Sequence, residues 1–291
     1  MRKNHSIETS EESGVRFLHF GSEWVQGAMR VARPHTLELE YTREMMACLL
    51  LRAGDSSSKN SIQHWPKNVL QIGLGAASLT KFWYRYFPRT SQTVVEINPG
   101  VVAMAYQSFK LPRDEAANID IQIGDGVKWI SESTQKFDCI MVDGYDQNAR
   151  FGALGTPDFY RDCRARLTKQ GLLVLNLFGR SRGYRSQLDA LNDVFNYRVL
   201  ALPPIDSAPG ASDGGNAIVF AAVGETMALD MQTLRESAAR IQDLTGLKLA
   251  RTLMRLERVD SHDRAIFSGH VRANTSTDEP RGHKKARNAR E

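Results

Sequence analysis

The feature that most constrains this chain is a regular alternation of short apolar runs and amphipathic stretches between residues 67 and 223. The apolar runs have the length of strands, and the stretches between them repeat apolar residues at helical spacing. Strands that alternate with helices form βαβ units, which build a mostly parallel sheet with helices on both faces. We therefore predict a doubly wound, Rossmann-like α/β fold with a seven-stranded sheet. The predicted strands are residues 69–72, 93–97, 119–123, 137–142, 172–178, 197–202 and 217–223.

Helical patterns fill the gaps between most of these strands. They cover residues 79–86, 99–109, 126–133, 157–167 and 184–195. The last two strands are joined differently, by a segment rich in Pro, Gly, Ser and Asp at 203–215. A connection without a helix suits antiparallel neighbours, so we expect a hairpin at one end of the sheet.

The flanking segments differ from this core in composition. Two short strand patterns surround Gly21, and a helical pattern follows over 35–51. The first residues are polar and acidic, and the last are of low complexity and basic. We expect a disordered leader (1–13), a short strand-rich N-terminal element (14–60), the α/β domain (61–225), charged helices (226–268) and a disordered basic tail (269–291).

The charge balance excludes several classes of protein. The chain has a formal net charge of +5, but residues 270–291 alone carry 6 Lys and Arg against 3 Asp and Glu. The basic character therefore belongs mostly to the tail, and nucleic-acid binding is not expected of the α/β domain. No apolar run approaches a membrane span. Cys48, Cys139 and Cys163 are widely spaced and form no metal motif, which favours buried thiols, no metal and a cytoplasmic location.

A glycine-rich turn after the first strand of the α/β domain is the strongest local signal for a binding site. In VLQIGLGAAS, Gly73 and Gly75 let the backbone turn tightly and approach a ligand at the start of a helix. Glu96 ends the next strand, about 20 residues further on, where an acidic residue can accept both ribose hydroxyls of an adenosine. A strand-end salt bridge is the alternative for Glu96.

Two more groups of acidic residues follow predicted strands. Asp125, followed by Gly126, opens a helix and can either accept from an adenine amine or cap that helix. Asp143 and Asp146 follow the strand 137–142, at the sheet edge where open α/β sheets bind ligands. Two neighbouring carboxylates there can hold a cation or take a proton from an attacking amine. A solvated turn is the alternative.

Together these elements resemble the class I S-adenosylmethionine-binding fold. The stretch DGYDQNARFGALGTPDFY, residues 143–160, further resembles the loop and helix start of the polyamine aminopropyltransferases, the spermidine synthase family. YTREM, residues 41–45, is similar to the helix that precedes the fold in that family. The resemblance covers roughly residues 15–225 and implies that 61–225 is an S-adenosylmethionine-type catalytic domain.

The resemblance implies a transferase of polyamine biosynthesis that moves an aminopropyl group from decarboxylated S-adenosylmethionine to a polyamine such as putrescine. Glu96 would bind the ribose of the donor, and Asp125 and Gly126 would contact its adenine. Asp143 would orient and deprotonate the attacking amine, and Asp146 and Tyr145 would help to hold the polyamine. It also implies a cytoplasmic homodimer without a metal.

Some residues depart from the family pattern. Ala76 stands where the family's glycine loop carries the Asp that holds the aminopropyl amine of the donor. Thr42 and Arg43 replace a Tyr-His pair, and Gln147 replaces a Pro. Without a carboxylate at position 76, the site would not repel the carboxylate of S-adenosylmethionine itself. An S-adenosylmethionine-dependent methyltransferase and a non-catalytic homologue therefore remain as alternatives.

Overall fold

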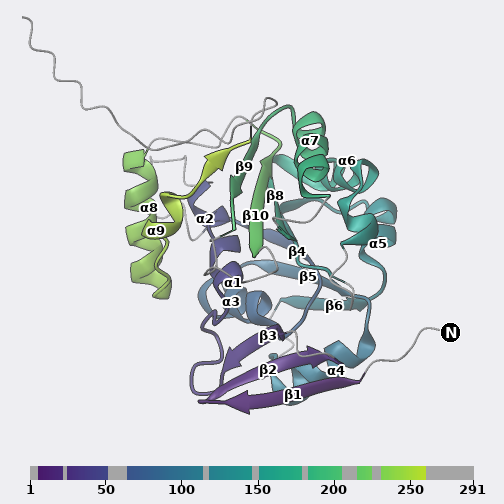
Figure 1. Cartoon of the computed structure of the whole chain (residues 1–291), viewed down its shortest axis with the longest axis vertical. Helices are drawn as coiled ribbons and strands as arrows, with labels where there is room; N and C mark the ends of the chain where they lie inside the picture. Colours follow the sequence, from purple (N-terminus) through teal and green to yellow (C-terminus); the bar gives the residue numbers. More distant parts are fainter. Residues whose placement is uncertain are drawn as a thin grey trace, which may run out of the picture.

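The computed structural model describes residues 6–21, 25–51, 64–113, 118–145, 151–178, 183–204, 215–224 and 231–259. These residues form an eight-stranded sheet flanked by helices and a separate three-stranded sheet, seen at the bottom of Figure 1. None of the helices in this part of the chain has the length and apolar character of a membrane span.

The large sheet confirms the predicted α/β fold. Its strand order is β11-β9-β10-β8-β7-β4-β5-β6. Strands β4 to β8 are parallel to their neighbours among themselves, and β10 runs antiparallel to both β8 and β9. The strands are β4 (Asn68–Ile72), β5 (Ser91–Glu96), β6 (Ile119–Ile123), β7 (Phe137–Val142), β8 (Leu167–Phe178), β9 (Val199–Leu202), β10 (Asn216–Ala222) and β11 (Glu257–Arg258). The predicted terminal hairpin is therefore β9–β10.

The prediction of seven strands was wrong by one. The eighth strand, β11, pairs with the outer side of β9 through Glu257 and Arg258. Two residues are too few to produce an alternating pattern, so this strand left no signal in the sequence. In addition, β8 begins at Leu167, where the sequence predicted the last residue of a helix.

Helices cover both faces of the large sheet, as Figure 1 shows. Successive residues of a strand point to opposite faces, and the central strands follow this rule. Val69, Cys139 and Leu172 pack into one cluster, while their neighbours Leu70, Ile140 and Leu173 pack into the other. The helices α1 (Glu40–Met45), α2 (Cys48–Leu51), α3 (Ser78–Tyr86), α8 (Met231–Thr245) and α9 (Ala250–Leu253) contribute to the first cluster. The helices α5 (Gly126–Glu132), α6 (Pro157–Arg166) and α7 (Tyr184–Phe195) contribute to the second.

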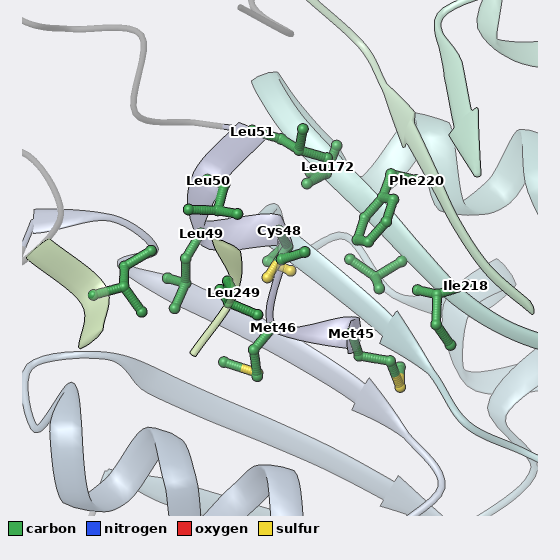
Figure 2. Packing of buried hydrophobic residues seen from close by; sticks show 14 of the residues in the cluster. Met45, Met46, Cys48, Leu49, Leu50, Leu51, Leu172, Ile218, Phe220 and Leu249 are labelled. Atoms are coloured by element: carbon green, nitrogen blue, oxygen red, sulfur yellow. The ribbon is translucent and has the colours of Figure 1, made fainter. Parts of the chain in front are cut away.

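The expected helix at 35–51 is divided into the two short helices α1 and α2. Between them, the backbone N–H groups of Met46 and Ala47 bond three residues back, to Arg43 and Glu44, instead of four. Figure 2 shows the apolar side chains of this region beside Leu172, Ile218 and Phe220 of the sheet. Because these residues are almost fully buried, tertiary packing holds α1 and α2 rather than their own short hydrogen-bond ladders.

The prediction of a disordered leader over 1–13 was wrong for its described residues. Strand β1 (Ile7–Glu12) pairs antiparallel with β2 (Val15–Phe20), and β2 pairs with β3 (Val25–Arg30), which confirms the two strands around Gly21. Five of the six β1 residues are exposed, so the strand lacks the apolar alternation that would reveal it. Ile7 packs against α4 (Pro99–Ser108) and its surroundings, which anchors this polar strand.

The C-terminal helical pattern is confirmed in part. Helices α8 and α9 lie within the expected 226–268 segment, and both pack against the first cluster. The basic tail at 269–291 lies outside the described residues.

Candidate active site

The carboxyl ends of β4 and β7 meet through backbone contact at Gly73. Its N–H donates to the carbonyl of Val95 at 2.9 Å, and the N–H of Asp143 donates to the carbonyl of Ile72 at 2.9 Å. Gly73 has φ +94°, and a Cβ atom there would lie 2.2 Å from the carbonyl oxygen of Asp143. Only glycine permits this approach, so the glycine turn directly places the first acidic residue after β7.

The rest of the glycine turn packs beneath the N-terminal sheet. Gly75 has φ +52°, and Ala76 is 3% exposed. On β3, a Cβ atom at Gly27 would lie 2.6 Å from the Cβ of Ala76. Position 76 is therefore closed by a neighbouring strand, and no space is left there for a carboxylate side chain.

Glu96 is held at the end of β5 by backbone donors. Its Oε2 accepts from the N–H of Leu74 at 2.9 Å, and its Oε1 accepts from the N–H of Asn98 at 2.8 Å. Burial raises the pKa of this carboxyl, which is 7% exposed, and the backbone hydrogen bonds partly offset that rise. No described Lys or Arg forms an ion pair with Glu96, so the structure does not support the salt-bridge interpretation.

Asp125 caps helix α5, as one of its two interpretations predicted. Its Oδ1 accepts from the N–H groups of Val127 at 2.8 Å and Lys128 at 3.3 Å. No described residue donates to its Oδ2, and Asp125 is exposed. Gly126 has a packing role, because a Cβ there would lie 2.4 Å from Cγ2 of Ile72. Contact of Asp125 and Gly126 with an adenine stays a prediction.

Two apolar side chains beside these acidic residues were missed by the sequence reasoning. Ile97 follows Glu96 and is 54% exposed, and Ile123 ends β6 and is 59% exposed. Ile123 is the cross-strand partner of Glu96 in the β5–β6 pair. Their apolar character at strand ends looked like ordinary strand sequence, so only the structure shows that both are exposed at this edge.

Asp143, which follows β7, accepts hydrogen bonds from two side chains. Its Oδ2 accepts from the hydroxyl of Tyr41 at 3.0 Å, and its Oδ1 accepts from the amide Nδ2 of Asn176 at 2.8 Å. The Nδ2 of Asn216 donates to the Oδ1 of Asn176 at 2.7 Å, which fixes the orientation of that amide. Burial raises the pKa of Asp143, while the Asn176 and Tyr41 hydrogen bonds oppose the rise. Burial and the nearby Asp143 carboxylate raise the pKa of Tyr41 well above its usual value, so Tyr41 remains a donor.

Sequence reasoning missed all three of these supporting side chains. Asn176 was the most visible, because it interrupts the apolar run LLVLNLF and is 2% exposed. A buried amide in a central strand requires partners, and that requirement could have identified it. Tyr41 entered only as part of the family-like helix, and its contact with Asp143 spans 102 residues.

Of the other two predicted residues of this loop, the structure describes Tyr145 alone. The hydroxyl of Tyr145 donates to the backbone carbonyl of Asn176 at 2.7 Å, and its ring lies 5.2 Å from that of Phe151. Its role in holding a polyamine stays a prediction. Asp146 lies outside the described residues.

The three cysteines of the chain are not part of this group of residues. Cys48, Cys139 and Cys163 are free and buried. No group of three or more His, Cys, Asp or Glu side chains that could hold a metal ion occurs in the described ranges.

The fold and this edge define a Rossmann-like α/β protein with a group of acidic residues at the carboxyl ends of its parallel strands. Solved structures agree with the fold. A probable spermidine synthase from Corynebacterium glutamicum superposes with a TM-score of 0.63 at 20% identity, covering 84% of this chain and 86% of that one. A spermidine synthase in complex with the transition state analogue AdoDATO superposes with a TM-score of 0.54 at 18% identity, covering 82% and 79%.

Sequence comparison identifies the family. The model of the spermine/spermidine synthase domain matches residues 56–177. A polyamine aminopropyltransferase from Chromobacterium violaceum is 34% identical over 265 residues, covering 91% of this chain and 93% of that protein. One from Neisseria meningitidis is 34% identical, covering 86% and 89%. This chain belongs to the polyamine aminopropyltransferase family and is an enzyme, a transferase.

Proposed function

We propose that this enzyme transfers the aminopropyl group of decarboxylated S-adenosylmethionine to an amine of a polyamine such as putrescine. The observation that carries the proposal is the half-buried carboxylate of Asp143, which is held by a phenol and an amide at the carboxyl edge of the sheet. A carboxylate whose pKa is raised by burial is a stronger base than one in water. Family membership supports the same reaction.

The donor would bind across the ends of β4, β5 and β6. Gly73 and Gly75 allow close approach of the backbone. The Glu96 carboxylate has about four acceptor positions, so it retains at least one for a ribose hydroxyl beyond its backbone donors Leu74, Asn98 and Ile97. The adenine would contact Gly126 and Oδ2 of Asp125, to which no described residue donates. Ile97 and Ile123 offer exposed apolar surface beside it.

The chemistry requires little more than position and proton removal. The substrate amine enters as an ammonium, and Asp143 takes one of its protons, which frees the nitrogen lone pair. That lone pair attacks the aminopropyl carbon in line with the carbon–sulfur bond. The new carbon–nitrogen bond forms as the bonding electrons return to sulfur, so that methylthioadenosine leaves and the product carries the new secondary ammonium. Asp143 then returns its proton to water. Tyr145 and Asp146 would hold the distal part of the polyamine.

The alanine at position 76 favours a second candidate, methyl transfer from S-adenosylmethionine. Position 76 has no carboxylate, and Gly27 packs directly on it, so no acidic side chain there would repel the carboxylate of the parent cofactor.

We also propose that the enzyme is a cytoplasmic homodimer. The three buried free cysteines support a reducing compartment. The open sheet β1-β2-β3, whose outer strands pair with no other described strand, offers an interface. Light scattering of the purified full chain would give the mass of a monomer if the dimer proposal is wrong.

A matrix of donors and acceptors tests the function. Decarboxylated and parent S-adenosylmethionine are each combined with putrescine, spermidine and cadaverine, and products are identified by mass. Aminopropyl transfer from the decarboxylated donor supports the proposal, and methyl transfer from the parent supports the second candidate. If neither donor reacts and methylthioadenosine does not bind, both are wrong.

Variants assign the base. Asp143→Asn should lower kcat by about 10²–10⁴-fold, the usual contribution of a general base. Asp189→Asn removes an exposed carboxylate of α7 and should leave kcat unchanged. Equal activity of Asp143→Asn and wild type would exclude Asp143 as the base.

A further inference from the structure

An ion pair joins the first helix of the chain to its C-terminal segment. Arg255, which follows α9, donates from Nη1 to Oε1 of Glu44 on α1. Glu44 is 4% exposed and the Arg255 side chain is 28% exposed, so the carboxylate of this pair lies out of water and the arginine covers it from the solvent side. Its partners are 211 residues apart in sequence, and nothing in the local pattern around either residue predicts the contact.

The same guanidinium makes a second attachment. Its Nη2 donates to the backbone carbonyl of Pro203, just after β9. Arginine carries five donors in a rigid planar fork, so it can hold two acceptors in a fixed relation. Arg255 thereby ties together α1, the end of β9 and the segment between α9 and β11.

Helix α1 depends on such attachments. It contains six residues, and its N-cap, Leu39, makes no side-chain hydrogen bond to the helix. An isolated helix of this length is not stable. Its position in the protein is therefore set by what its side chains contact.

Glu44 and Tyr41 occupy neighbouring positions on this helix. They are three residues apart, and residues at this spacing lie on the same side of a helix. Tyr41 donates to Oδ2 of Asp143 at 3.0 Å, a distance with little tolerance for displacement. A shift of α1 by a fraction of a turn would break that hydrogen bond.

We propose that Arg255 is a positioning residue: by holding Glu44, it fixes α1 where the hydroxyl of Tyr41 reaches the carboxylate of Asp143. The catalytic meaning of this contact rests on the proposed function. This ion pair differs from an exposed salt bridge because Glu44 is buried. Burial raises the pKa of its carboxyl, and Arg255 opposes that rise. Removing the arginine leaves an acid that is buried and unpaired, which favours movement of the helix toward water or protonation of Glu44.

The ionisable surroundings of both carboxylates are defined. Glu44 also experiences Glu40 and Arg43 of its own helix. Asp143 is faced by the hydroxyl of Tyr41 and the amide of Asn176, and its charge acts on Glu96. The effect of Arg255 on Asp143 is therefore expected to pass through Tyr41.

The first experiment compares Arg255→Met with Arg251→Met. Arg251 is an exposed arginine of α9 in the same segment, and it serves as the matched control. Arg255→Met should lower kcat by about tenfold, because displacements near 1 Å at a reacting group cost up to about a hundredfold. It should also move the acidic limb of the kcat/KM profile upward by roughly one pH unit, since Asp143 loses a hydrogen bond that lowers its pKa. Arg251→Met should change neither quantity.

The second experiment asks whether the effect passes through Tyr41. Tyr41→Phe should reproduce the upward shift, and Arg255→Met should add no further shift in the Tyr41→Phe background. An additional shift in the double variant, or an unshifted profile in Arg255→Met, would overturn the proposal. Arg255→Lys keeps the charge and should recover part of the wild-type profile.

The third experiment guards against loss of folding. Glu44→Gln combined with Arg255→Met leaves no unpaired buried charge, so this variant should unfold closer to the wild-type temperature than Arg255→Met does. It should still show the shifted pH profile, because the anchor of α1 is gone. A wild-type profile in this double variant would show that the ion pair does not position Tyr41.

A carboxyl titration separates this inference from the proposed function. In protein labelled with ¹³C at the aspartate side chains, the Asp143 carboxyl should titrate at a higher pH in Arg255→Met than in wild type. This measurement requires no substrate. If wild type transfers no aminopropyl group, the proposed function fails, but the titration still decides whether Arg255 acts on Asp143.

Discussion

Gly73→Ala tests whether the glycine turn places Asp143. The new Cβ would lie 2.2 Å from the carbonyl oxygen of Asp143, whereas ordinary contact begins at 3.4 Å. The ends of β4 and β7 must therefore separate by about 1.2 Å, the difference between these distances. A displacement near 1 Å at a catalytic group can cost about 10²-fold in rate, or about 2.7 kcal/mol of transition-state stabilisation.

A second glycine separates the collision from backbone strain. Gly246 also has a positive φ, +75°, and its Cβ would meet nothing within 4 Å. Gly246→Ala should therefore cost about 1–2 kcal/mol of folding free energy from strain alone. Gly73→Ala should cost about 1–3 kcal/mol beyond that, because two backbones must also separate.

The assays are urea unfolding for stability and the aminopropyl transfer rate for activity. We expect Gly246→Ala to retain wild-type kcat and Gly73→Ala to lose about 10²-fold. If folded Gly73→Ala keeps kcat within twofold of wild type, Gly73 does not determine the position of Asp143. Equal losses in the two variants would assign the effect to strain rather than to collision.

Three further predictions follow from buried polar groups. Asn176→Leu removes a donor that lowers the pKa of Asp143, so the acidic limb of the pH–rate profile should move upward by roughly one unit; an unmoved limb would contradict this. Burial lowers the pKa of Lys81 to about 7. Above that pH the unfolded chain binds more protons than the folded one, so the free energy of unfolding should rise from pH 7 toward 10. In urea titrations, Lys81→Met should lose this rise with pH, and a rise that persists would belong to other groups. Glu96→Gln should weaken methylthioadenosine binding by about tenfold in calorimetry, with Glu132→Gln, an exposed carboxylate of α5, as the unaffected control.

The sheet could be predicted because its central strands are buried on both faces. Runs such as CIMV in β7 are apolar throughout, and such runs identify strands without knowledge of their neighbours. The polar strand β1 could not be found in this way, because its stability comes from pairing with β2 and from contacts such as the ion pair between Arg16 and Glu11. That information lies in the partner, not in the strand.

In the candidate site, the acidic residues were predictable from the sequence, whereas the contacts that support them were not. Glu96 and Asp143 were found because each ends an apolar strand, and the carboxyl ends of parallel strands share one edge. Tyr41 was not found, because its contact with Asp143 depends on the packing of a six-residue helix against the sheet. The interlock of Gly27 and Ala76 was hidden for the same reason, since it joins two separate sheets.

That interlock limits which side chains the glycine turn can carry. Gly27 has no room for a side chain, and Ala76 is buried beneath it. An acid introduced at position 76 would bury an unpaired charge against a strand, at a cost of several kcal/mol. Such a substitution therefore requires a compensating change in β3, so the sequence of the small sheet restricts the sequence of the turn in the large one.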